Sequence, residues 1–242
     1  MTAASRLLAA RTVVAGGRAG PGWVELAGDR IAHVGTGPPP RTPDVDLGDA
    51  VLVPGFVDVH VHGGAGAAFP DGDVDAAATA IRFHRAHGTT TMLASLVSAG
   101  AGELLKAVDA LAELVTDGEL AGVHLEGPWL ATARCGAHDP DQLREPDPGE
   151  LDRLLRAGDG AVRMVTLAPE LPGGVDAVRR IVDAGVVAAL GHTDATYALT
   201  REAIAAGARM GTHLFNAMAP VHHREPGPAV ALLEDPRAPS SW

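Results

Sequence analysis

Two histidines stand at the carboxyl end of an apolar segment early in the chain. The segment 53–62 is largely apolar and ends with His60 and His62, which two glycines follow. Because alternate side chains of a strand point to one face, both imidazoles face the same way. Paired imidazoles leaving an apolar strand are typical of half a metal site. Two solvated histidines in a turn would give the same spacing, so this motif alone leaves both interpretations open.

A glutamate and two further histidines end later apolar segments. Glu126 ends the segment 122–126, His192 follows a segment that ends at residue 191, and His213 lies in the next one, 210–214. A carboxylate at the end of an apolar strand is costly to bury unless a cation neutralises it, although a helix cap or an arginine partner would also serve. Three Glu and His ligands with one open position are typical of a catalytic metal site. Such an ion polarises carbonyl groups and activates water, which predicts amide or ester hydrolysis.

The separations between these residues place them on different strands of one sheet. A βαβ repeat takes roughly 30 residues, so Glu126 follows His62 by about two repeats, and His192 follows Glu126 by about two more. His124 shares a face with Glu126, and either supports the ligands or simply packs. Strands and helices alternate from residue 53, which predicts a parallel sheet with right-handed crossovers. The predicted strands lie in the segments 53–62, 90–95, 122–126, 163–167, 186–191 and 210–214. The predicted helices are 74–87, 102–116, 149–156, 174–184 and 198–206.

The predicted fold is α/β, with two parts. Residues 53–242 form a (β/α)8-type TIM barrel that is incomplete, with about six βα units, and its strand ends carry the polar residues above. Residues 1–52 contain short strands at 12–14, 23–26 and 30–34 between Gly and Pro turns. They predict a small N-terminal β-sandwich portion that is too small to form a good core by itself.

The bulk composition excludes several classes of partner. The net charge of −11 argues against nucleic acid and against an anionic membrane surface, so an anionic substrate needs locally convergent cations. Cys135 is the only cysteine, which gives no disulfide framework. The N-terminal apolar run is too short for a signal peptide, and no stretch approaches the length of a membrane span. We therefore expect a cytoplasmic protein.

The motifs together resemble those of the N-acetylglucosamine-6-phosphate deacetylases, in the amidohydrolase superfamily. The resemblance covers essentially the whole chain, and its motifs are residues 54–63, 124–130, 136–138, 191–195, 213–218 and 224–227. It implies a metal-dependent hydrolase of amino-sugar catabolism that converts N-acetylglucosamine 6-phosphate to glucosamine 6-phosphate and acetate. Many other amidohydrolases use a carboxylated lysine on a barrel strand, but Lys106, the only lysine, lies within a predicted helix.

The resemblance also implies the roles of individual residues. By position, Glu126, His192 and His213 match the main metal ligands, and His60 and His62 match a second pair, so one or two divalent ions, zinc above all, are expected.

His138 matches a catalytic histidine near the scissile amide, with a loop histidine of no role as the alternative. Asn216 and Ala217 match residues that contact the sugar phosphate. Arg224 matches an arginine that binds the phosphate in the neighbouring subunit's site, which implies a homodimer if the fold is intact. A guanidinium fork suits a phosphate dianion, but a surface turn arginine is the alternative. His222 and His223 have no expected role beyond a solvated loop.

The family pattern extends beyond residue 242. A full barrel needs two more strands, and the family's catalytic aspartate, near the end of the last strand, has no counterpart in these 242 residues. We therefore expect a C-terminally truncated chain, in which unassisted proton delivery to the leaving amine lowers the rate by roughly 10²–10⁴-fold. Two alternatives stay open, namely another amidohydrolase acting on N-acyl or cyclic amides, and an inactive truncated remnant.

Overall fold

The computed structural model describes residues 5–237, which divide into two compact units. The first unit runs through Phe56 and the second begins at Val57. The boundary expected from the sequence, after residue 52, lies a few residues earlier. Both boundaries place the strand that ends at Leu52 in the first unit, where it pairs with the first strand of the chain.

The N-terminal unit is a five-stranded sheet. Its strands occur in the order β3-β2-β1-β4, and β5 also pairs with β1. The first three strands form an antiparallel meander, whereas β4 and β5 run parallel to β1. The three strands predicted here exist and are longer than expected, while β4 and β5 were not predicted. The bounds are β1 Ser5–Ala15, β2 Arg18–Ala27, β3 Arg30–Thr36, β4 Val45–Asp46 and β5 Val51–Leu52.

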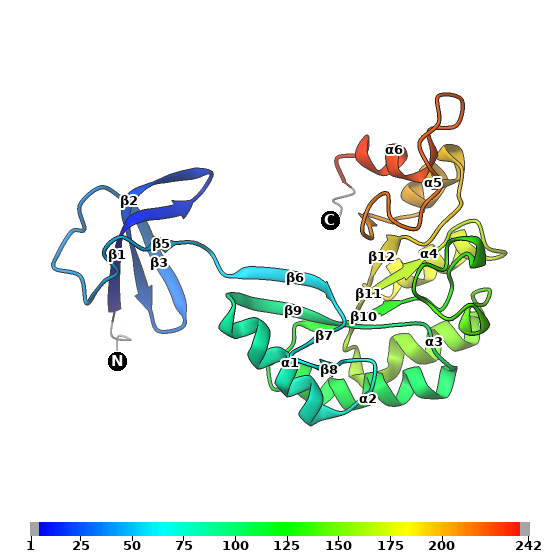
Figure 1. Cartoon of the computed structure of the whole chain (residues 1–242), viewed down its shortest axis with the longest axis horizontal. Coiled ribbons are helices and arrows are strands. Elements are labelled where there is room, and N and C mark those ends of the chain that lie inside the picture. Colours follow the sequence, from blue (N-terminus) through cyan, green and yellow to red (C-terminus); the bar gives the residue numbers. More distant parts are fainter. Residues whose placement is uncertain (1–4, 238–242) are drawn as a thin grey trace. The chain divides into compact units, whose positions relative to one another are not determined.

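The second unit is built on a six-stranded sheet in the order β13-β12-β11-β10-β9-β6 (Figure 1). The pairs from β9 through β13 are all parallel. This sheet is a parallel half-barrel, so the prediction of an incomplete barrel with about six units is confirmed. Its strands are β6 Phe56–Val61, β9 Thr89–Leu96, β10 Gly122–Glu126, β11 Val162–Leu167, β12 Val187–Leu190 and β13 Met210–Gly211.

Helices alternate with these strands and cover the sheet. Helix α1 contacts β9, α2 contacts β9 and β10, α3 contacts β11, and α4 contacts β12. Polar caps mark several helix starts; for example, the Asp73 carboxylate accepts a hydrogen bond from the Ala76 N–H. The helices are α1 Val74–Ala86, α2 Ala101–Thr116, α3 Pro148–Arg156, α4 Gly174–Asp183, α5 Tyr197–Ala205 and α6 Gly227–Leu233.

The core lies between the sheet and these helices. Its largest buried side chains include Phe69, Ile81, Leu111, Leu125 and Trp129, all almost inaccessible to solvent. Burying a side chain of this size stabilises the fold by about 1.5–3 kcal/mol. The core thus fixes the strands whose carboxyl ends carry the polar residues.

Several short elements were not predicted from the sequence. They are the hairpin of β7 Gly63–Gly64 with β8 Ala67–Ala68, the helix α6, and three 3₁₀ turns at Thr132–Arg134, Pro140–Gln142 and Ala157–Asp159. Strand β13 is also shorter than predicted, because His213 has a positive φ angle and leaves the extended conformation. Lys106 lies within α2, as expected.

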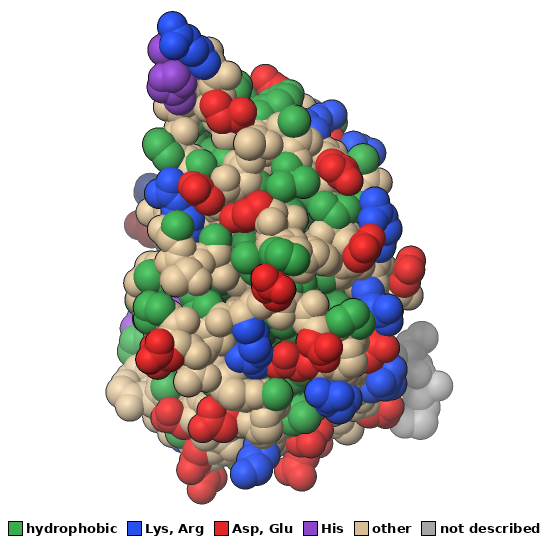
Figure 2. Space-filling model, turned by 90° about the vertical axis from the view of Figure 1, so that its right-hand side faces the viewer, with side chains coloured by type: hydrophobic (Ala, Val, Ile, Leu, Met, Phe, Trp, Pro, Cys, Tyr) green, Lys and Arg blue, Asp and Glu red, His purple; other side chains and the backbone are tan. Residues whose placement is uncertain are grey.

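Among the helices of the described residues, none is both long and apolar enough to cross a membrane. Acidic and basic side chains are interspersed over the face of the molecule in Figure 2.

Candidate metal centre and its cavity

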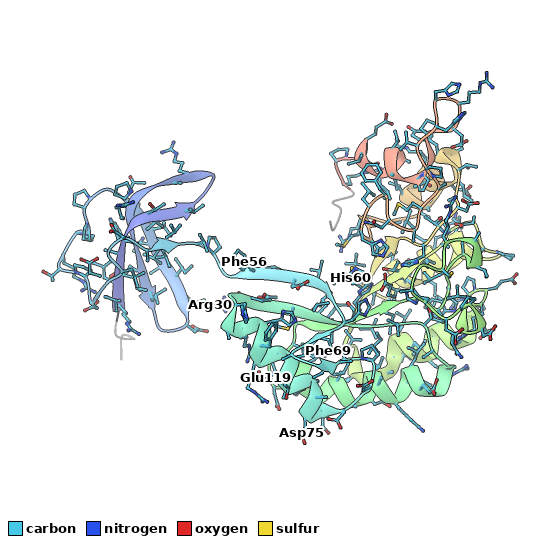
Figure 3. All side chains as sticks on the ribbon, in the orientation of Figure 1. Arg30, Phe56, His60, Phe69, Asp75 and Glu119 are labelled. Atoms are coloured by element: carbon cyan, nitrogen blue, oxygen red, sulfur yellow. The ribbon has the colours of Figure 1, made fainter. Side chains whose placement is uncertain are left out.

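The predicted ligands meet at the carboxyl ends of the strands of the second unit. His60 lies at the end of β6, where other polar side chains gather (Figure 3). Glu126 ends β10, His192 follows β12 and His213 follows β13. Two groups of potential ligand atoms result, each with its atoms within 4.8 Å of one another: His60, His62 and Glu126, and Glu126, His192 and His213. Glu126 belongs to both groups.

Each carboxylate oxygen of Glu126 faces two imidazoles. Oε2 lies 3.1 Å from His60 Nε2 and 2.9 Å from His62 Nε2. Oε1 lies 3.1 Å from His192 Nε2 and 3.0 Å from His213 Nε2. Within each pair, the two Nε2 atoms are 3.1 Å and 3.0 Å apart. The cluster is therefore two three-atom groups that share one bridging carboxylate.

The donor set fits a divalent cation. His62 Nδ1 lies 3.1 Å from the Ser95 carbonyl oxygen, and His192 Nδ1 lies 2.8 Å from the Arg134 carbonyl oxygen. A carbonyl only accepts hydrogen bonds, so each Nδ1 carries a proton, and the nitrogen left to bind a cation is Nε2, which faces the cluster. Ligands about 2.0–2.1 Å from a tetrahedral zinc ion are separated by about 3.3 Å, close to the observed spacing.

Glu126 is ionised in this environment. Its side chain is 4% exposed, and burial alone would raise the pKa of the carboxyl group. The side chains of His138, His192, His213 and His60 beside the carboxylate outweigh burial and hold the pKa of Glu126 well below its usual range. Burial lowers the pKa of His213, but its hydrogen bond with Glu126 prevails and raises it. A buried anion ringed by imidazoles is the electrostatic arrangement that a cation would complete.

His138 differs from the other histidines in its hydrogen bonding. Its Nδ1 accepts a hydrogen bond from the Ser98 N–H, at 3.3 Å. A neutral imidazole has one proton, which must therefore sit on Nε2, 3.6 Å from Glu126 Oε2. The ring is buried and packs edge-on against that of His192. His138 thus presents an N–H donor to the centre rather than a lone pair.

A second layer of polar groups, which the sequence analysis largely missed, lies beside the cluster. His124 is fully buried, and its ring bridges the Ser95 and Thr166 hydroxyl groups at 2.8 Å each. Thr166 in turn bonds the Thr212 hydroxyl at 2.7 Å. Burial first, and His60 next, hold the pKa of His124 well below its usual value, so the ring is neutral. The available signal was a single polar residue within each of several apolar strands.

The backbone around the ligands is strained. His192 and His213 have φ angles of 49° and 29°, and Phe215 and Ala217 have φ angles of 74° and 48°. Residues other than glycine rarely adopt positive φ angles, and those that do are concentrated at functional sites. These conformations turn the chain sharply after β12 and β13, so that both imidazoles point at Glu126.

A cavity of about 660 Å³ opens over the cluster. This volume suits a small organic ligand. Besides the five potential ligands, it is lined by His138, Ser98, Asn216 and Ala217, among others. Arg224 does not line it and lies in an exposed turn before α6. The structure thus brings together every predicted site residue except Arg224.

Sequence comparison with known families places the chain. The sequence model of the Amidohydrolase family matches residues 51–235, a range that contains the whole cluster. The chain belongs to the amidohydrolase family. Amidohydrolases are metal-dependent, and the shared cluster around Glu126 could hold a metal ion.

Similar amidohydrolases share one type of name. A solved structure of a mutant N-acetyl-D-glucosamine-6-phosphate deacetylase from Mycobacterium smegmatis, in complex with N-acetyl-D-glucosamine-6-phosphate, has 56% sequence identity and a TM-score of 0.95, and covers 98% of this chain and 62% of its own. The N-acetylglucosamine-6-phosphate deacetylase of Bacillus subtilis is 35% identical, over 85% of this chain and 54% of its own length. An N-acetylgalactosamine-6-phosphate deacetylase of Escherichia coli O157:H7 is 37% identical, over 78% of this chain and 51% of its own. The chain spans about half the length of these two curated relatives.

Proposed function

We propose that this chain carries the metal centre and acyl-group cavity of an N-acetylglucosamine-6-phosphate deacetylase, which releases acetate and glucosamine 6-phosphate in amino-sugar catabolism. The observation that carries the proposal is the arrangement around Glu126. Four imidazoles surround the carboxylate, and His138 turns a protonated nitrogen toward the same centre. The names of the similar proteins supply the substrate class.

The proposed ligands are Glu126, His192 and His213 for one zinc ion, and His60 and His62, with the second oxygen of Glu126, for another. When bound, a divalent ion supplies Lewis-acid polarisation of a carbonyl group and lowers the pKa of water. The surrounding backbone orients two of these ligands. The Ser95 carbonyl group accepts the Nδ1–H of His62 and the Arg134 carbonyl group accepts that of His192, so the Nε2 atom of each ring is free to bind a metal ion.

His138 is proposed as the donor that acts on the substrate. Its Nε2–H lies beside the cluster and borders the cavity, where it would bind the amide oxygen as negative charge develops on that atom. A preorganised donor of this kind is worth roughly 10²–10³-fold in rate. Ser98 fixes its orientation through the backbone N–H rather than through a titratable group.

The phosphate group is proposed to meet Asn216 and Ala217 in one subunit and Arg224 of the other. Asn216 and Ala217 border the cavity. Arg224 lies in an exposed turn with His222 and His223, whose rings are 4.2 Å apart, and has no carboxylate partner among residues 5–237. A tip of histidine and basic side chains stands at the top of Figure 2. An unpaired guanidinium there is available to a neighbouring subunit, so we propose a homodimer.

Deacetylation of N-acetylgalactosamine 6-phosphate is the second candidate. It is supported by the 37% identity to a deacetylase of that name. The two substrates differ at one sugar hydroxyl group and share the acetamide and the phosphate. The same centre would therefore serve either, and a direct comparison of the two sugars distinguishes them.

The test is acetate release by purified residues 1–242, with metal content measured on the same sample. We expect bound divalent metal, acetate release from the 6-phosphate sugars in preference to unphosphorylated N-acetylglucosamine, and loss of both metal and acetate release in Glu126→Gln. The matched control is Glu113→Gln, an exposed glutamate of α2. Equal metal content in wild type and Glu126→Gln would contradict the proposed centre. Hydrolysis that is indifferent to the phosphate, or of cyclic amides instead, would contradict the proposed substrate.

A further inference from the structure

A glutamate outside the proposed metal centre accepts hydrogen bonds from the turn that follows His192. Glu170 follows β11, and its two carboxylate oxygens accept hydrogen bonds from the Asp194 N–H and the Thr193 hydroxyl, both at 2.5 Å. Thr193 is fully buried. One carboxylate thus fixes the two residues that follow His192.

Arg134 holds the same turn from the side. Its guanidinium donates two hydrogen bonds to Asp194 Oδ1, from Nε at 2.9 Å and from a terminal nitrogen at 2.7 Å. Its carbonyl oxygen accepts the His192 Nδ1 proton at 2.8 Å. The Arg134 side chain therefore binds Asp194 in this turn, and the Arg134 backbone carbonyl group orients the His192 imidazole.

These contacts join two segments that are far apart in the sequence. The Ala131 N–H donates to the His192 carbonyl oxygen at 3.0 Å, and Gly136 lies so close to the His192 ring that an added Cβ would be 3.1 Å from Cε1. The segment 131–138 ends at His138. Any movement of this segment against the turn would therefore shift His138 and His192 relative to each other.

We propose that Arg134, Asp194 and Glu170 form a clamp that positions the His192 imidazole and the His138 segment against each other. These are positioning residues, because they line neither the cluster nor the cavity. The proposal rests on the proposed function in assigning His192 to a metal and His138 to the substrate. An exposed ion pair contributes little stability by itself, so the clamp acts on geometry, through the Arg134 carbonyl group.

The experiment compares Arg134→Ala, Asp194→Ala and the double variant with a control, Arg180→Ala. Arg180 pairs with Asp152 at 2.9 Å, with side-chain exposures of 45% and 30% against 31% and 48% for Arg134 and Asp194. Two readouts are used on the whole chain, namely cobalt(II) affinity with the visible spectrum of the bound ion, and amide hydrogen exchange without metal. Losing the support of a ligating histidine typically weakens metal binding by about 10–100-fold.

We expect each single variant to weaken cobalt(II) affinity at least about tenfold, to alter the cobalt spectrum, and to increase exchange in both 131–138 and 191–195. The double variant should be little worse than either single one, because both remove the same interaction. Arg180→Ala should match wild type.

Unchanged cobalt affinity in both single variants would overturn the proposal, even with faster exchange, because the pair would then stabilise the loops without positioning the ligand. If the wild-type chain binds no cobalt, the proposed metal centre fails separately; increased exchange at both segments would still support the clamp, and unchanged exchange would overturn it. If Asp194→Ala does not fold, Glu170→Gln is measured in its place, because it weakens the hydrogen bonds that Glu170 accepts from Thr193 and Asp194 in the same turn.

Discussion

Gly136 offers the sharpest test of how closely the candidate metal centre is packed. Its φ angle is 58°, and a Cβ added there would be 3.1 Å from Cε1 and 3.5 Å from Nδ1 of His192. Gly136→Ala therefore meets two penalties. The left-handed backbone costs about 1–2 kcal/mol for any residue with a Cβ. The close contact then pushes a ring whose Nδ1 and Nε2 are already held at 2.8 Å and 3.1 Å by Arg134 and Glu126.

Gly160→Ala separates these penalties. Gly160 has a φ angle of 79° and no atom within 4 Å of its added Cβ, so it carries the backbone strain alone. We expect urea unfolding of the metal-free proteins to show a loss of about 1–2 kcal/mol in Gly160→Ala and a larger loss in Gly136→Ala, which adds the close contact to the backbone strain. Zinc affinity, measured by chelator competition, should fall about tenfold in Gly136→Ala only, as for other perturbations of a ligand's support. Equal zinc affinities in the two variants would refute the claim that the His192 ring has no room to move.

Two further predictions concern the support of the fold. Thr166→Val should destabilise the protein by about 1–3 kcal/mol in urea unfolding, because it leaves the buried His124 Nε2 without its hydrogen-bond partner. The control Thr116→Val, on the exposed face of α2, should not destabilise the protein, and equal losses in the two variants would contradict this reasoning. Arg237 holds the pKa of Asp235 below its usual value, so the contribution of Asp235 is present above about pH 4 and is lost as the pH falls further. Urea midpoints of Asp235→Asn and wild type should therefore converge in acid, and a constant gap down to pH 2 would contradict this.

The strands could be predicted wherever apolar character ended in a polar residue. The segment 122–126 was predicted as a strand and is β10 without change. The segment 210–214 was also predicted as a strand but forms one only at Met210–Gly211, because a run of apolar and polar residues does not reveal that His213 takes a positive φ angle. Strand β13 therefore ends before its histidine. Conformations imposed by packing around a site override local propensity, and sequence patterns carry little trace of them.

The candidate site could be predicted by residue type but not by hydrogen bonding. Strand-end spacing brought Glu126 and the histidines together, as the structure does. The Arg134 and Ser95 carbonyl groups could not be foreseen as their partners, because every residue has a carbonyl group and only the fold selects which one meets a ring. Arg134 and Asp194 carried no motif signal as a pair, since a salt bridge between distant residues is a property of the folded chain.

The backbone divides chemically identical histidines into two roles. His62 and His192 donate Nδ1–H to carbonyl oxygens and turn Nε2 lone pairs toward Glu126. His138 accepts an N–H at Nδ1, so its Nε2 carries the proton toward the same carboxylate. Metal-assisted amide hydrolysis needs both kinds, since lone pairs bind the cation and a donor stabilises the charge that develops on the amide oxygen. A centre with every ring oriented like His192 would bind a metal but would lack this donor. The orientation of His138, set by the Ser98 N–H, is therefore what favours a catalytic over a purely structural metal site.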